Sequence, residues 1–313
     1  MHAPTISTPS DPSLSIDDLR TLISKALTDG LTGQIQIAFQ NDKVATLFAL
    51  HGNVRQVYIR NHRAPNTDWE FLVDQFGEGT LDIQPMPARA FPFAKIILEE
   101  TDAPEPEIVE TTRLETLFNQ AERDAGATLF HIRWEGVEGF VLVAGRNIPL
   151  RRAALVNQTG DGKNADGLEQ LSLWEEAQYS VTMYRADIKR QAWLEVHLNI
   201  LFEWYCAHIL KQYSLLTGTV MVRSVLRSIA SLAERNGWRI AAQNLEVKDE
   251  TLFADSAQAG DAYREILLSI LASIEPVVGG ALTRNILKQL ADRTRDVYAS
   301  IMEVYHLTER AEP

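Results

Sequence analysis

The residues best suited to chemistry lie in one short segment, VNQTGDGKNADGLEQL at 156–171, which is rich in glycine, aspartate and amide side chains. Backbone amides of glycine-rich loops bind phosphates, and clustered carboxylate and amide oxygens bind calcium. A phosphate loop requires Ser or Thr after its Gly-Lys pair, but Asn164 stands there. A calcium loop starting at Asn157 would need glutamate at its twelfth position, where the chain has Leu168. We therefore interpret the segment as a solvated connection ahead of a helix.

The histidines of the C-terminal third are too far apart to bind one metal ion. His197 and His208 fall on one face of a predicted helix, but this separation corresponds to roughly 16 Å along the helix axis. Glu195, Asn199 and Glu203 form a polar stripe on the same helix, which is typical of a solvated or domain-facing surface. The chain also lacks the H-E-x-x-H, G-x-S-x-G and G-x-G-x-x-G motifs. We therefore predict no catalytic residues, no cofactor and no metal site.

A glycine pair ahead of a predicted helix offers a candidate anion site. Gly279 and Gly280 precede the helix, and Arg284 and Lys288 lie near its start. The free amides of a helix N-terminus, together with basic side chains, can bind an anion. The competing interpretation is a break between two helices, in which the glycines permit a sharp turn or close packing. Both alternatives stay open on the sequence.

The composition is that of a globular protein. The 313 residues are 45% hydrophobic and 23% charged, enough for two or three domains with their own cores. The formal net charge of −12 argues against nucleic acid and anionic membranes as partners. No apolar run approaches the roughly 20 residues of a membrane span, and the N-terminus lacks the features of a signal peptide. We expect a cytoplasmic protein without membrane insertion, in which the single cysteine, Cys206, is a packed thiol.

An internal repeat organises the first two thirds of the chain. At an offset of 95 residues, Leu19 falls on Leu114 and Ile37 falls on Ile132. Each copy has the pattern of a helix, a small antiparallel meander, a second helix and a last strand. Two copies of one supersecondary unit explain this order of elements.

These patterns divide the chain into five parts. From residue 188 onward the pattern is wholly helical. Apolar residues lie on nearly every side of the first predicted helix, and later helices are expected at 219–235, 260–275 and 281–306. We therefore expect an α+β protein with two repeated helix-plus-meander units followed by an all-α bundle. The parts are a disordered tail at 1–14, a first repeat at 15–100, an acidic proline-containing linker at 101–110, a second repeat at 111–187 and the bundle at 188–313.

The second repeat resembles a known family. Its residues 139–184 contain small and apolar positions in a characteristic order: Gly145, Ala153, Ala154, Gly167, Leu168, Leu171, Trp174 and EEAQY at 175–179. The first repeat carries a weaker version in Gly52, Trp69, Leu72, Phe76 and GEGTLDI. This layout resembles the PATAN or DUF4388 family. The resemblance implies a bacterial regulatory module that binds proteins in signalling chains with receiver domains, or in motility and surface-organelle control, and it implies no catalytic residue set.

We therefore expect a non-enzymatic regulatory or scaffold protein. Its partner would be another protein, such as a receiver-domain or small-GTPase-type regulator, and a homodimer is allowed. Tryptophan and tyrosine are common anchors of interfaces, and our candidates are Trp174, Tyr179, Trp193 and Trp204. The alternative is a small-molecule or anion sensor that uses the C-terminal bundle or a cleft between the repeats.

Overall fold

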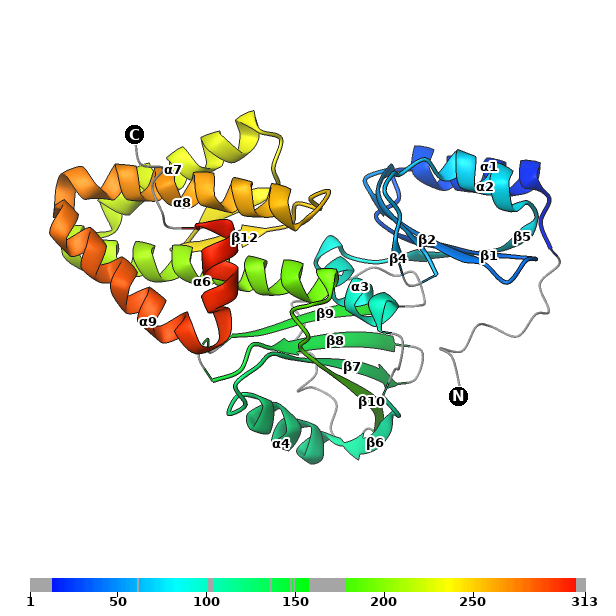
Figure 1. Cartoon of the computed structure of the whole chain (residues 1–313), viewed down its shortest axis with the longest axis horizontal. Helices are drawn as coiled ribbons and strands as arrows, with labels where there is room; N and C mark the ends of the chain where they lie inside the picture. The colour runs from blue at the N-terminus through cyan, green and yellow to red at the C-terminus, as the bar shows by residue number, and fades with distance from the viewer. Residues whose placement is uncertain are drawn as a thin grey trace. The chain divides into compact units, whose positions relative to one another are not determined.

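The computed structural model describes residues 13–60, 62–100, 104–134, 137–146, 148, 150–157 and 178–307 (Figure 1). The chain forms two compact units. The first contains both large β-sheets, and the second consists mainly of the residues from Ala186 onward. Two short segments, Ala121–Gly126 and Ala144–Leu150, also belong to the second unit. The mixture of helices and antiparallel sheets confirms the predicted α+β class.

The first sheet is an antiparallel meander with a returning strand. Its elements are α1 (Ile16–Thr28), β1 (Gly33–Phe39), β2 (Val44–Leu50), β3 (Asn53–Ile59), β4 (His62–Arg63), α2 (Trp69–Phe76) and β5 (Gly79–Pro85). The strand order is β4-β3-β2-β1-β5. Leu19 and Ile23 of α1 and Leu72 and Val73 of α2 pack with β1, β2 and β3 residues in one buried cluster. The amphipathic helices thus cover the apolar side of the meander.

Local interactions determine where α1 begins and how β2 turns into β3. Ser15 accepts a hydrogen bond from the Asp18 amide at 3.2 Å, so it caps α1 as an N-terminal serine should. His51 and Gly52 join β2 to β3 with φ angles of 49° and 76°. Such a two-residue turn matches the twist of a hairpin. Of the predicted tail, only residues 13 and 14 are described, and Leu14 pairs with Gly79 through a backbone bond of 2.8 Å.

The second sheet repeats the strand order of the first. Its elements are β6 (Glu107–Glu110), α4 (Thr111–Ala121), β7 (Thr128–Trp134), β8 (Val137–Val143), β9 (Arg151–Asn157) and β10 (Gln178–Arg185). The order is β6-β10-β7-β8-β9, so β9-β8-β7-β10 corresponds to β3-β2-β1-β5 of the first sheet. In both sheets a three-strand meander receives the last strand beside its first, as an internal repeat requires. The last residues of the predicted linker form strand β6, which pairs with β10 and so belongs to the second sheet.

One helix of the first unit was not anticipated. After the 3-10 turn η1 (Ala88–Ala90), helix α3 (Phe91–Glu99) is buried on most sides. Phe91 packs on Phe48 of the first sheet at 5.3 Å, and Phe93 packs on Phe140 of the second at 6.1 Å, measured between ring centroids. A short helix with apolar residues all round has no amphipathic period, so it is hard to detect from sequence.

The second unit is helical but not all-α. It contains α6 (Gln191–Thr217), α7 (Thr219–Arg235), β11 (Ile240–Gln243), β12 (Glu246–Asp249), α8 (Ser256–Val278) and α9 (Gly280–Tyr305). The prediction of a purely α-helical bundle was wrong, because β11 and β12 form a hairpin. Its turn residues Asn244 and Leu245 adopt positive φ angles of 52° and 66°. Leucine rarely occupies this conformation, so the turn lacked its usual sequence signature.

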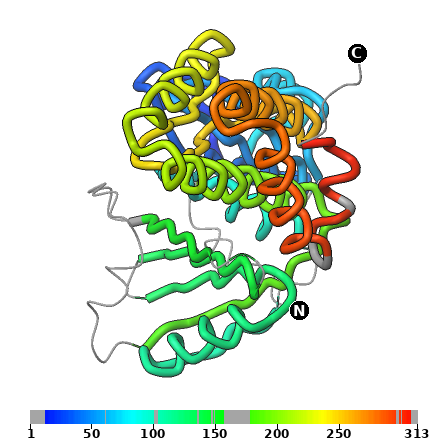
Figure 2. Tube along the Cα trace, turned by 90° about the vertical axis from the view of Figure 1, so that its left-hand side faces the viewer, coloured from blue at the N-terminus to red at the C-terminus, as the bar shows by residue number. Residues whose placement is uncertain are grey.

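The helices of the second unit meet in pairs at glycines. Gly218 ends α6 and begins α7 with φ 81°, and Gly279 does the same between α8 and α9 with φ 85°. Within this unit, α6 and α8 run in the same direction, so both junctions lie at the same end, on the left of Figure 1. Figure 2 looks onto this end. Within the described part of the chain, no helix is long and apolar enough to cross a membrane.

Candidate functional site

Part of the predicted site lies outside the described residues. Of the polar segment 156–171, only Val156 and Asn157 are described, and the interface candidate Trp174 is not. Residues 167–177, which carry much of the family resemblance, also lie outside the description. The loop interpretation and the role of Trp174 therefore stay predictions.

Two of the predicted interface anchors are core residues instead. Tyr179 on β10 is fully buried and packs edge to face on Trp134, with ring centroids 5.7 Å apart. Trp193 at the start of α6 is also fully buried. Trp204 is half-buried and packs on Tyr205. The apolar spacing around Tyr179 and Trp193 therefore reflects packing within the sheet and the helix. Among the described candidates, Trp204 alone is partly exposed to solvent.

The candidate anion site already has a carboxylate beside it. Arg284 and Lys288 are exposed on the first turns of α9, next to Gly279 and Gly280. A Cβ atom built on Gly280 would lie 2.7 Å from Glu275 Oε1 and 3.5 Å from Arg284 Nη1. An external anion at this helix N-terminus would therefore meet a negative charge of the chain itself, which weakens the amide attraction.

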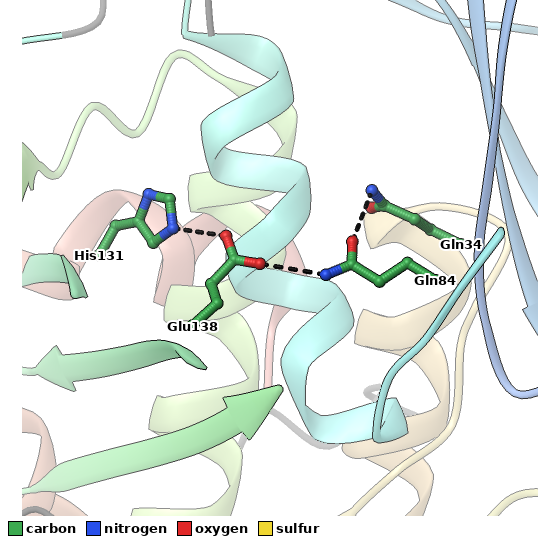
Figure 3. A network of polar contacts seen from close by, with 4 residues as sticks. All are labelled: Gln34, Gln84, His131 and Glu138. Carbon is green, nitrogen blue, oxygen red and sulfur yellow. Dashed lines mark hydrogen bonds and ion pairs between the residues drawn. The ribbon is translucent and has the colours of Figure 1, made fainter. Parts of the chain in front are cut away.

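A polar network links the two sheets of the first unit (Figure 3). Gln34 on β1 donates a hydrogen bond from Nε2 to Gln84 Oε1 on β5 at 3.2 Å. Gln84 Nε2 in turn donates to Glu138 Oε2 on β8 at 3.2 Å. The other carboxylate oxygen, Glu138 Oε1, lies 2.5 Å from His131 Nε2 on β7. His131 is buried and stacks on Phe140 at 5.1 Å.

The environment of Glu138 favours its ionised form. Burial by itself raises the pKa of this carboxyl, but the hydrogen bond and charge of His131, together with Gln84 and Arg133, lower it below its usual value. A carboxylate held ionised by three partners is a poor general acid at neutral pH. The network is therefore better suited to joining two sheets than to proton transfer.

A second polar cluster joins the hairpin of the second unit to two helices. Tyr263 on α8 donates to Asp249 Oδ2 on β12 at 2.5 Å, and Asn199 Nδ2 on α6 donates to the Tyr263 hydroxyl at 3.1 Å. The Asp249 amide donates to Glu203 Oε1 at 2.9 Å, and the Thr251 amide donates to Asp249 Oδ1 at 2.8 Å. Asn199 and Glu203 belong to the polar stripe predicted as solvated or domain-facing, and the structure shows that they hold the hairpin.

The carboxyl of Asp249 is correspondingly perturbed. Its enclosure, with the nearby charge of Glu203, raises the pKa of Asp249 to about 6, although hydrogen bonds from Tyr263 and Thr251 act in the opposite direction. Two acidic groups alone do not make a metal site. Over the residues that the structure describes, no group of three or more His, Cys, Asp or Glu side chains could hold a metal ion.

The core of α6 holds a histidine and the cysteine in unreactive settings. His197 Nδ1 lies 2.8 Å from the Trp193 carbonyl, and burial lowers the pKa of His197. Cys206 is fully buried, and this burial, with the charge of Glu203, raises the pKa of its thiol. The prediction of a packed thiol is confirmed, and both groups are held in their neutral forms.

The feature that the sequence interpretation missed is an exposed apolar surface at the shared end of the helical pairs. Five large apolar side chains there are exposed: Leu215 by 73%, Leu216 by 52%, Val220 by 72%, Met221 by 40% and Val277 by 48%. The sequence feature that could have revealed this surface is the run LLTGTVM at 215–221. Its apolar residues flank a helix-breaking glycine, a place where loop residues are usually polar.

No family model, no curated protein and no solved structure matches the chain. The resemblance to the PATAN or DUF4388 family therefore stays a prediction, and the candidate surface must be judged by its own chemistry.

Proposed function

We propose that the protein is a non-enzymatic regulatory or scaffold protein of the cytoplasm that binds other proteins. The observation that carries this proposal is the exposed apolar set at the two helix junctions, Leu215, Leu216, Val220, Met221 and Val277. Soluble proteins expose scattered apolar side chains, but a group at one end of a helical unit is typical of an interaction surface. Signalling, or motility and surface-organelle control, are the settings that the family resemblance suggests.

The size of the apolar set indicates what kind of binding it supports. Complete burial of a large aliphatic side chain contributes roughly 1.5–3 kcal/mol, so five half-exposed ones contribute on the order of 5 kcal/mol. Association costs an estimated 4–15 kcal/mol in lost freedom. Apolar burial alone therefore supports a weak or transient complex, which suits a regulatory contact. A receiver-domain or small-GTPase-type regulator is the first class of partner to test.

The proposal is tested by partner capture with paired surface variants. Leu215→Ser combined with Val220→Ser removes the two most exposed side chains of the set, while Phe71→Ser, 54% exposed on α2, is the control elsewhere on the chain. We expect affinity purification with mass spectrometry to lose a specific partner with the double variant and to keep it with the control. Thermal stability should stay unchanged in both, since the side chains are exposed.

Two outcomes would contradict the proposal. One is a partner list that is identical for wild type, double variant and control. The other is a melting shift with a nucleotide or metabolite in a ligand screen, without any captured protein, which would favour the sensor alternative.

A further inference from the structure

Most of the charged side chains near the exposed apolar set are basic. Residues 204–233 contain Lys211, Arg223 and Arg227 but no aspartate or glutamate, and residues 276–291 contain Arg284 and Lys288 and again no acidic residue. All five basic side chains are exposed. The whole chain carries a net charge of −12, so this end has the opposite sign to the rest of the molecule.

These basic groups are available to an external partner. Among the residues that the structure describes, Lys211, Arg223, Arg227 and Lys288 take part in no ion pair. His208 on α6 reports the local positive field: after burial, Arg293 and Lys211 are the causes that lower its pKa. Glu275 is the acidic group at the border of the region, beside Arg284.

Apolar and basic side chains share one face of α7. On α7, Val220, Arg223 and Arg227 are spaced by three and four residues, which places them on one helical face. The stacked rings of Phe202 on α6 and Tyr263 on α8 are 4.1 Å apart, so these two residues are level.

The two junctions are level as well. Leu216 and Val277 each follow one of the stacked rings by the same number of residues, roughly 21 Å of helix. Because α6 and α8 run in the same direction, the last turns of both helices, which contain Leu216 and Val277, lie at the end seen in Figure 2.

We propose that this end of the helical unit, defined by the five apolar and five basic residues named above, binds an acidic amphipathic helical segment of a partner protein. The inference rests on the proposed function and specifies its partner. An acidic helix with an apolar stripe would bury Leu215, Val220 and their neighbours while its carboxylates meet Arg223 and Arg227. This charge pairing adds binding free energy to the contribution of the small apolar area, which by itself supports only a weak complex.

Charge also discriminates against the other occupants of such a surface. A symmetric contact between two copies would bring the same basic groups face to face, and like charges across an interface are unfavourable. A lipid surface is disfavoured because the exposed side chains are aliphatic or methionine rather than the aromatic anchors of membrane interfaces. The basic side chains would by themselves attract anionic lipids, so the test below includes phosphatidylserine vesicles.

The test uses two synthetic helical peptides with the same leucine stripe, one with glutamate and one with lysine at its polar positions. Fluorescence anisotropy should show that the full-length protein binds the glutamate peptide, with affinity falling as salt rises. Arg223→Glu with Arg227→Glu should weaken this binding at least tenfold and create binding of the lysine peptide. Arg55→Glu with Arg60→Glu makes the same charge change on the exposed side of the first unit and should have no effect.

Several results would overturn the inference. They are equal affinity for both peptides, unchanged binding by the Arg223 and Arg227 variant, sedimentation with phosphatidylserine vesicles, and a concentration-dependent dimer that this variant abolishes. If partner capture is lost with Leu215→Ser and Val220→Ser but kept with the charge reversal, the acidic partner class is wrong while the proposed function stands. If neither variant changes capture, the proposed function itself fails.

Discussion

The carboxyl of Asp249 titrates in a pH range where exposed aspartates are already ionised. Its pKa is raised from 3.8 to about 6 in the folded chain. The folded state therefore holds a proton that the unfolded state has lost, and stability falls as pH rises between these two values. A shift of about two pKa units corresponds to roughly 3 kcal/mol. Above pH 6 this destabilising contribution is fully present.

We therefore predict that Asp249→Asn removes a pH dependence of folding. Asparagine keeps the shape and can still accept the hydrogen bond from the Thr251 amide, but it carries no charge. Urea unfolding at pH 4.5 and pH 7.5 should show a loss of stability toward pH 7.5 in wild type that is smaller by about 2 kcal/mol in the variant, because about a third of the penalty is already present at pH 4.5. An equal pH difference in both proteins would show that Asp249 is not the titrating group.

Glu138 shows the opposite behaviour, because its pKa is lowered in the folded chain. Its contribution to stability is present above the ordinary glutamate pKa and is lost as pH falls through the lowered value. We predict that Glu138→Gln costs about 1–3 kcal/mol at pH 7, since it weakens a charge-assisted bond to buried His131. Glu115→Gln is the matched control: Glu115 pairs with Arg151 at 3.5 Å but its side chain is 56% exposed. Surface pairs contribute little, so chemical denaturation should barely detect the control.

At the scale of elements, the two helix junctions depend on backbone conformations that favour glycine. Gly218 and Gly279 combine φ angles of 81° and 85° with ψ angles of 164° and 148°. This region is essentially restricted to glycine, and other residues there cost about 1–3 kcal/mol. Gly280 lies inside α9, and its added Cβ would meet only the flexible end of Glu275 and, farther off, Arg284.

We predict that Gly279→Ala lowers the free energy of unfolding by about 1–3 kcal/mol, whereas Gly280→Ala changes it by less than about 1 kcal/mol. The neighbouring variant is the control for the loss of a glycine as such. Equal losses for both variants in denaturant unfolding would mean that close packing, and not the backbone angle, selects glycine at this junction.

The elements that could be predicted are those whose pattern is local. Helix α7 follows its apolar period and ends before Asn236 and Gly237, so its bounds agree with the prediction for 219–235. Helix α3 and the β11–β12 hairpin were missed because their stability comes from distant partners, such as Phe48 and Glu203. The buried networks around Glu138 and Asp249 were missed for the same reason, since their members lie many residues apart in the chain.

At the scale of the whole molecule, each unit has a core of its own. Ile35 is fully buried within the first sheet, and Ile270 is fully buried within the helical unit. The replacement of a buried isoleucine by alanine typically costs 2–5 kcal/mol through lost contacts and a residual cavity. A loss confined to one core should open that core before the other.

We therefore predict that the two units respond separately to matched core substitutions. In hydrogen-exchange mass spectrometry at low denaturant, Ile35→Ala should speed exchange in β1, β2, β3 and β5 and leave α6, α7 and α8 protected. Ile270→Ala should produce the reverse pattern. Both variants serve as each other's control, because the chemical change and the depth of burial are the same. Equal acceleration throughout the chain in both would mean that the units unfold as one cooperative body, in which case a partner bound at the helical end would stabilise the repeated sheets as well.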